Sequence, residues 1–128
     1  MSQIHHDVTF AAAPSRVYRA LTDAKEFAEW TGAAAAIDAT AGGALLCFGE
    51  FILGRNVELV QDQRIVQAWR VFNWPAGVYS IVRFELTAER GGTRLEFDQD
   101  GVPADAEPHV NGGWETKYWA PLREYFKS

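Results

Sequence analysis

The sequence predicts an α+β domain with the element order strand, two short helices, six strands in series and one long C-terminal helix. From Pro108 to Ser128, apolar side chains recur with the helical period and include Trp114 and Tyr118. Pro121 interrupts this pattern, and because proline removes a backbone hydrogen bond, a bend is expected between Lys117 and Pro121. A helix with such an aromatic face needs a large concave apolar surface, which the strands are expected to supply.

Composition limits the number of domains and the classes of partner. The 128 residues are enough for one domain with its own core, so residues 1–128 are interpreted as a single domain. A net charge of −5 without a basic run argues against nucleic-acid binding, which depends on Lys and Arg neutralising phosphates. Charged residues interrupt every apolar run and no secretory signal is visible, so no membrane contact is expected. Cys47 is the single cysteine, which excludes an internal disulfide and favours a cytoplasmic location.

The N-terminal segment predicts one strand followed by two short helices. Residues Ile4–Phe10 alternate in polarity, so the neighbouring His5 and His6 point to opposite faces and are not expected to share a metal ion. A proline in the first turn opens the first helix. Residues Asp23–Glu26 form a capping-box pattern for the second helix, which Gly32 is expected to end.

Period-two patterns predict six strands in the middle of the chain. They cover residues 33–39, 44–51, 56–60, 65–72, 78–88 and 93–99. Phe48 and Glu50 share one face of their strand, and Gly54 is expected to mark a turn or a bulge. Short connections make neighbouring strands antiparallel. Eight positions on the strands and the last helix are expected to be buried together: Val82, Phe84, Leu86, Leu95, Phe97, Trp114, Tyr118 and Leu122.

Four segments together resemble one family. They are FAAAPSRVYRALTD from Phe10, IVQAWR from Ile65, the alternating strand at Val82 followed by GGTRL from Gly91, and Gly113-Trp114 with Tyr118-Trp119 and Leu122. In this order they resemble the START-like (SRPBCC) superfamily, and within it small proteins similar to the C-terminal domain of the heat-shock-protein-90 ATPase activator. The resemblance implies a helix-grip fold, in which a curved antiparallel sheet wraps the C-terminal helix and two small helices close one end. Because functions in the superfamily diverge, it implies the fold and not the activity.

The same resemblance bears on partners. The full-length co-chaperone has a further, N-terminal domain that is needed to engage the chaperone. In this sequence the first expected strand begins near Ile4, so a chaperone partner is not the favoured expectation. Folds of this type commonly enclose a cavity, and the resemblance therefore favours a small-molecule ligand.

Few polar residues are placed to act in such a cavity. Glu50 is the first candidate, because it shares a strand face with apolar residues. Glu115 lies within the apolar arc of the last helix, although near a helix N-terminus a solvated carboxylate is the more favoured interpretation. Cys47 is interpreted as a small buried hydrophobe and not as a reactive thiol. The sequence contains no recognised catalytic motif, metal-ligand motif or cofactor motif.

Three functions follow from these observations. The preferred one is a module that binds a hydrophobic or amphipathic small molecule without cofactor or metal. One alternative is a cyclase or dehydratase that uses a cavity carboxylate, although an enzyme is less favoured than a binding module. The other is a chaperone-interacting domain. The sequence leaves the oligomeric state open. A bulky residue at Ala35 or Ala36 is expected to fill the cavity. The expected cavity residues are Trp30, Phe48, Glu50, Phe51, Trp69, Phe84, Trp114 and Tyr118.

Overall fold

The computed structural model describes residues 2–127, and within them one antiparallel sheet has the strand order β1-β7-β6-β5-β4-β3-β2. The strands are β1 (Ser2–Phe10), β2 (Ala36–Ile37), β3 (Ala44–Cys47), β4 (Ile52–Val60), β5 (Arg64–Val71), β6 (Ser80–Glu89) and β7 (Gly92–Val102). The helices are α1 (Pro14–Thr22), α2 (Ala24–Thr31), α3 (Glu107–Gly113), the π-helical η1 (Trp114–Trp119) and α4 (Ala120–Phe126). The predicted α+β class and element order are confirmed.

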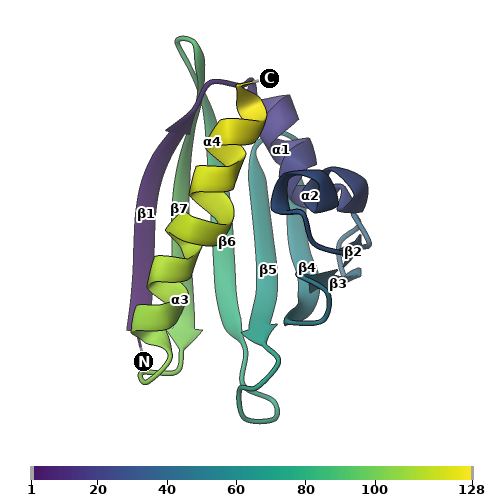
Figure 1. Ribbon diagram of the computed structural model, residues 1–128, viewed down its shortest axis with the longest axis vertical. Helices are drawn as coiled ribbons and strands as arrows, with labels where there is room; N and C mark the ends of the chain where they lie inside the picture. The colour runs from purple at the N-terminus through teal and green to yellow at the C-terminus, as the bar shows by residue number, and fades with distance from the viewer. Residues whose placement is uncertain (1, 128) are drawn as a thin grey trace.

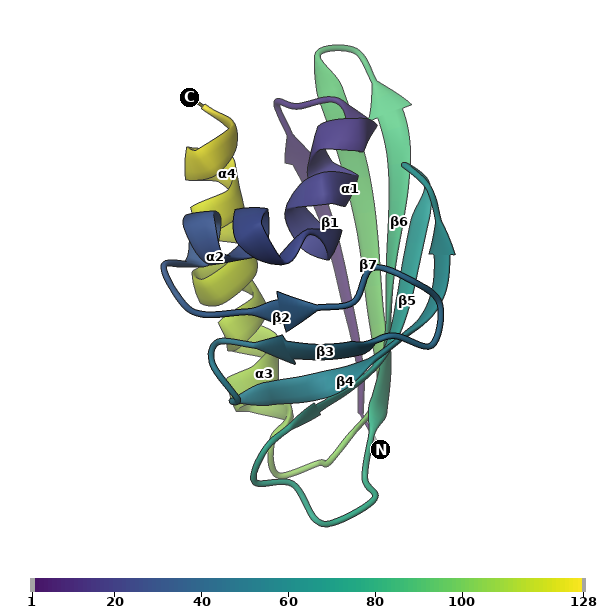
Figure 2. The ribbon, with the colours of Figure 1, turned by 90° about the vertical axis from the view of Figure 1, so that its right-hand side faces the viewer.

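The sheet and the C-terminal helix form two layers. Figure 1 shows α3 and α4 running obliquely across the face formed by β1, β7 and β6. Seen from the side, β2, β3 and β4 turn away from the other strands and extend toward the helix, while α1 and α2 lie beside its C-terminal half (Figure 2). The concave face that results holds the core, as the helix-grip expectation requires.

Alternation along β6 and β7 decides which side chains enter this core. Phe84 pairs with Phe97 across the two strands, and both are almost fully buried. Arg83, between the inward positions of β6, is exposed and its Nη2 donates to Asp98 at 2.9 Å. All eight residues expected to be buried together are in one core cluster, so the predicted register is confirmed.

The two N-terminal helices begin and end as their sequence predicts. The Asp23 carboxylate accepts from the Lys25 N–H at 2.8 Å and from the Glu26 N–H at 3.2 Å, and Gly32 ends α2 in the left-handed conformation. The second half of the capping box does not form, because the Glu26 carboxylate binds Arg19 and the Tyr125 hydroxyl instead. Glu26 therefore links α1, α2 and α4.

The strand expected over residues 44–51 is too long. It ends at Cys47, and residues 48–51 make a turn in which Phe48 and Gly49 have φ angles of 55° and 70°. The hydrophobic alternation continues through the turn because Phe48 still packs against the core, so the pattern gave no sign that the backbone reverses. Glu50 lies exposed in this turn.

Two further expectations about strands are wrong in detail. Of the strand expected over 33–39, only Ala36–Ile37 pairs, since little besides alanine is available there to hold an edge strand. Gly54 is not in a turn; it lies inside β4, opposite Trp69 of β5. The irregularity in β4 comes later, as a register shift between Asn56 and Glu58.

The C-terminal helix changes its winding before Pro121. In η1 the Ala120 N–H donates to the Glu115 carbonyl, five residues back. The expected distortion near Pro121 thus takes the form of a widened turn. Because residues five apart are neighbours in such a turn, Trp119 stacks on Trp114 with ring centroids 5.6 Å apart and is fully buried, while Glu115 faces solvent.

Candidate functional site

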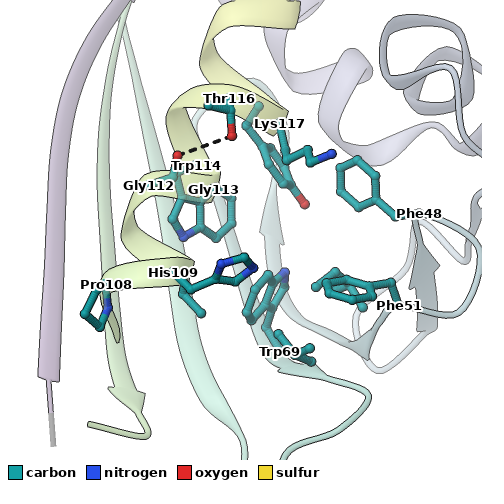
Figure 3. Close-up of a pocket in the computed structure, with 14 residues that line it drawn as sticks. Phe48, Phe51, Trp69, Pro108, His109, Gly112, Gly113, Trp114, Thr116 and Lys117 are labelled. Atoms are coloured by element: carbon teal, nitrogen blue, oxygen red, sulfur yellow. Dashed lines mark hydrogen bonds between the residues drawn. The ribbon is translucent and has the colours of Figure 1, made fainter. Parts of the chain in front are cut away.

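A pocket of about 740 Å³ opens between the first turns of the C-terminal helix and the β3–β4 side of the sheet (Figure 3). Its sheet side consists of the turn after β3, the start of β4 and the end of β5, and is lined by Phe48, Phe51, Ile52, Trp69 and Val71. Its helix side is lined by Pro108, His109, Val110, Gly112, Gly113, Trp114, Thr116, Lys117 and Tyr118. Aromatic and aliphatic side chains make most of this surface, which suits an apolar guest.

Five of the eight expected cavity residues line this pocket: Phe48, Phe51, Trp69, Trp114 and Tyr118. Trp30 and Phe84 do not line it; they are buried in the core behind Tyr118 and Trp114, which their rings contact at centroid distances of 5.4 and 6.0 Å. The expectation for Glu50 is wrong, because the turn after Cys47 carries its side chain into solvent.

Three other expectations concerned residues near the pocket. Ala35 and Ala36 are not among its lining residues, so a bulky residue there would not fill it. Glu115 is exposed, and the hydrogen bond from Arg123 Nη1, at 2.8 Å, holds the pKa of its carboxyl below the ordinary value. Cys47 is buried, and burial raises the pKa of its thiol to about 12, as expected of a small core residue and not of a nucleophile.

Sequence reasoning missed the glycines at the helix side of the pocket. Gly113 has helical angles (φ −62°, ψ −31°), so its conformation does not require glycine. A Cβ built at Gly112 or Gly113 would meet no neighbouring atom within 4 Å. Two consecutive glycines inside an aromatic helix were the available signal, since each costs helix stability. Their effect is to leave the helix backbone open to the pocket.

We expect Gly113→Ala to raise the free energy of unfolding by up to about 1 kcal/mol, because alanine is the better helix former and the added methyl meets no atom. A denaturant titration of the variant beside the wild type measures this. A loss of stability would mean that the helix backbone at this position is held in a conformation that alanine does not tolerate.

One buried polar atom in the lining has no partner. Trp69 is 4% exposed, and its Nε1–H makes no hydrogen bond with any residue that the structure describes. Figure 3 shows the indole between His109 and Phe51, with its nitrogen on the side of the pocket. A buried donor left without an acceptor costs about 1–3 kcal/mol. An acceptor atom of a ligand would be stabilised at this nitrogen once the atoms that cover it in this structure move aside.

The Tyr118 hydroxyl lies near this indole. Burial raises its pKa well above the ordinary value, and the Cys47 thiol adds to the increase. The Trp69 N–H, which lies close to the Tyr118 oxygen without the geometry of a hydrogen bond, acts in the opposite direction. The hydroxyl is therefore a neutral O–H donor at ordinary pH. Trp69 and Tyr118 together present donors, and no carboxylate is among the lining residues of the described chain.

A chain of hydrogen bonds behind the pocket wall connects two of the tryptophans that line the pocket, Trp114 and Trp69. The Trp114 Nε1–H donates to Gln99 Oε1 at 2.8 Å, and Gln99 Nε2 donates to the Ser80 hydroxyl at 2.9 Å. The Ser80 hydroxyl donates to the Trp69 carbonyl at 2.8 Å. These bonds connect the C-terminal helix to β7, β6 and β5, so the two tryptophans of the pocket wall are fixed relative to each other.

Among the described residues, no group of His, Cys, Asp and Glu is arranged to hold a metal ion. His5 and His6 diverge as expected: His5 binds Asp98, whereas His6 accepts from the Trp119 N–H at Nδ1 and donates from Nε2 to Asn111. No helix in residues 2–127 is both long and apolar enough to span a membrane.

The chain is similar in sequence to a protein family and to several curated proteins. A family model described as "Activator of Hsp90 ATPase homolog 1-like protein" matches residues 11–127. The mouse activator of 90 kDa heat shock protein ATPase homolog 1 is 28% identical over 118 residues, which are 92% of this chain and 35% of that protein. An uncharacterized protein of Schizosaccharomyces pombe is 29% identical over 98% of this chain and 37% of its own length. The chain thus spans about a third of these curated relatives.

Solved structures extend the likeness to the whole fold. The crystal structure of an HSP90 activator from Plasmodium falciparum superposes with a TM-score of 0.92 at 22% identity, covering 98% of this chain and 96% of the other. The solution structure of the Aha1 dimer from Colwellia psychrerythraea has a TM-score of 0.80 at 17% identity, covering 95% and 94%. The resemblance stated from the sequence is confirmed at the level of family and fold.

Proposed function

The chain belongs to the family of Activator of Hsp90 ATPase homolog 1-like proteins, and from this premise we propose that it binds a hydrophobic or amphipathic small molecule in the pocket beside its C-terminal helix. The observation that carries the proposal is the Trp69 N–H, a buried donor without a hydrogen-bond partner among the described residues, in the wall of a mostly apolar pocket. A phenylalanine, although smaller, would carry no such cost, so the donor has a use if a ligand oxygen accepts from it.

The size and the lining of the pocket support the proposal. Its volume of about 740 Å³ lies within the range of about 300–1,000 Å³ that is usual for small-molecule sites. Gly112 and Gly113 support it as well, because two glycines with open space above them lower helix stability and give access to the pocket in return. The alternative of an enzyme with a cavity carboxylate lacks its residue, since Glu50 and Glu115 both face solvent.

The test uses a neutral probe, N-phenyl-1-naphthylamine, whose fluorescence rises in an apolar site and which accepts energy from Trp69 and Trp114. Saturable binding at one site is expected for the wild type. In Gly113→Phe the new ring fills the helix side of the pocket, so the affinity is expected to fall about tenfold or more, which is about 1.4 kcal/mol. Gly113→Leu is the smaller variant for the case that the phenylalanine disturbs folding.

The matched control is Ala120→Phe, which adds the same ring at an exposed position of the same helix that does not line the pocket. It is expected to bind the probe like the wild type. Absence of saturable binding to the wild type, or an equal loss in Gly113→Phe and Ala120→Phe, would overturn the proposal of a ligand pocket.

A second candidate function is contact with a chaperone of the 90 kDa heat-shock class. It is favoured by the family match and by the fold shared with the Plasmodium falciparum HSP90 activator over nearly the whole of both chains. The chain spans about a third of the length of its curated relatives. The test therefore uses this chain and not a full-length relative. Retention of a purified 90 kDa chaperone on the immobilised chain, together with a rise in its ATP turnover, is the expected result; a chaperone that passes unretained with unchanged turnover removes this candidate.

A further inference from the structure

The lining of the pocket contains basic side chains and no carboxylate of the described residues. Besides the Trp69 N–H and the Tyr118 O–H, the side chains of Lys117 and His109 stand on its helix side, and no Asp or Glu of the described residues lines it. This bias runs against the composition of the chain, which has 17 acidic and 12 basic residues. The electrostatic character of the pocket therefore differs in sign from that of the protein as a whole.

Lys117 is the one ammonium group of the lining, and it is not neutralised by the protein. It forms no ion pair with any residue in the described range, whereas Arg123 of the same helix binds Glu115 and Lys127 binds Glu124. Figure 3 shows its side chain extending over the pocket, with the nitrogen on the side of Phe48. Lys117 itself is exposed, so a group bound to it would remain in contact with water.

We propose that the ligand of this pocket is an anionic amphiphile, with its apolar body between Phe48, Trp69 and Gly113 and a carboxylate-type head at Lys117. This inference rests on the proposed function and specifies its ligand class. A head at the mouth keeps most of its hydration, whereas a carboxylate placed deep against Trp69 would lose its water without gaining a cation. The deeper Trp69 and Tyr118 donors suit a neutral oxygen on the ligand body.

An opposite preference is physically possible, which makes the inference testable. Aromatic rings attract cations through their faces, so a pocket with five aromatic side chains could favour an ammonium head. Lys117 lies at the mouth of the pocket, where the ammonium head of such a ligand would emerge from between the rings. The two positive charges would repel each other. The head-group preference therefore depends on this single side chain.

The experiment compares three ligands with the same dodecyl chain, namely dodecanoate, 1-dodecanol and dodecylammonium, as competitors of N-phenyl-1-naphthylamine below their micellar concentrations. The expected order of affinity is dodecanoate, then dodecanol, then dodecylammonium. In Lys117→Met the ratio of dodecanoate to dodecanol affinity is expected to fall up to about fivefold, the upper end of the effect of an exposed ion pair. Added salt should narrow the same ratio in the wild type.

The control is Lys25→Met, which removes an exposed ammonium from α2, away from the pocket lining. It makes the net charge of −5 more negative by the same one unit as Lys117→Met, and it is expected to leave the ratio unchanged. Equal affinity for the three ligands, tighter binding of dodecylammonium, or an equal shift in both lysine variants would overturn the anionic head. Binding of N-phenyl-1-naphthylamine to the wild type separates failure of this inference from failure of the proposed function. If the wild type does not bind the probe, the pocket itself is not a ligand site. If it does bind the probe, only the anionic head is overturned.

Discussion

Replacing Trp114 by alanine is expected to lower the free energy of unfolding by about 3–5 kcal/mol. Trp114 is 2% exposed and its ring lies 4.2 Å from that of Phe97 and 4.3 Å from that of Tyr118, centroid to centroid. The substitution opens a cavity at the centre of the aromatic core. It also leaves the buried Gln99 Oε1 without the Trp114 N–H that it accepts.

Because Trp114 also lines the pocket, the loss of unfolding free energy in Trp114→Ala could be smaller than for a residue enclosed in the core. If water enters the new space from the pocket, part of the cavity cost is recovered, and a loss below about 1 kcal/mol would show that Trp114 is no core anchor. Trp114→Phe serves as the control, because it retains a ring and removes the hydrogen bond to Gln99. Denaturant midpoints of both variants separate the contribution of the ring from that of the hydrogen bond.

The sequence was sufficient to predict the parts of the fold that depend on local periodicity. Alternation along residues 78–99 placed Val82, Phe84 and Phe97 in the core, because a strand turns every second side chain to the same face whatever its neighbours are. The Asp23 cap and the Gly32 end of α2 were predictable for the same reason, since both act within one helical turn.

The candidate site was predictable only in part, because its details depend on backbone geometry that the pattern does not encode. The reversal at Phe48, with a positive φ in a residue other than glycine, broke the apparent strand and moved Glu50 into solvent. The widened turn of η1 rotated Trp119 inward and Glu115 outward, although Pro121 had indicated where a distortion would occur. Lys117 and His109 became part of the pocket through tertiary packing alone.

Gly54 shows how tertiary packing fixes a residue for reasons that the sequence does not reveal. It lies inside β4 opposite Trp69, and a Cβ built on it would stand 2.0 Å from the Ala68 carbonyl oxygen and 3.2 Å from the Trp69 Cα. Both atoms belong to the backbone of β5, so no side-chain rotation relieves the overlap. The backbones of the two strands therefore lie unusually close together beside Trp69, which lines the pocket.

Gly54→Ala is therefore expected to lower the free energy of unfolding by about 3 kcal/mol, at the upper end of overpacking effects, because β4 and β5 must separate. Trp69 forms the pocket wall on β5, so the affinity for N-phenyl-1-naphthylamine should fall in the molecules that remain folded. Gly113→Ala is the matched control, since the same methyl there meets no atom within 4 Å and should leave the stability equal or higher. If denaturant midpoints of the two alanine variants coincide, the strands can separate without cost, and the close contact at Gly54 does not hold Trp69 in the pocket wall.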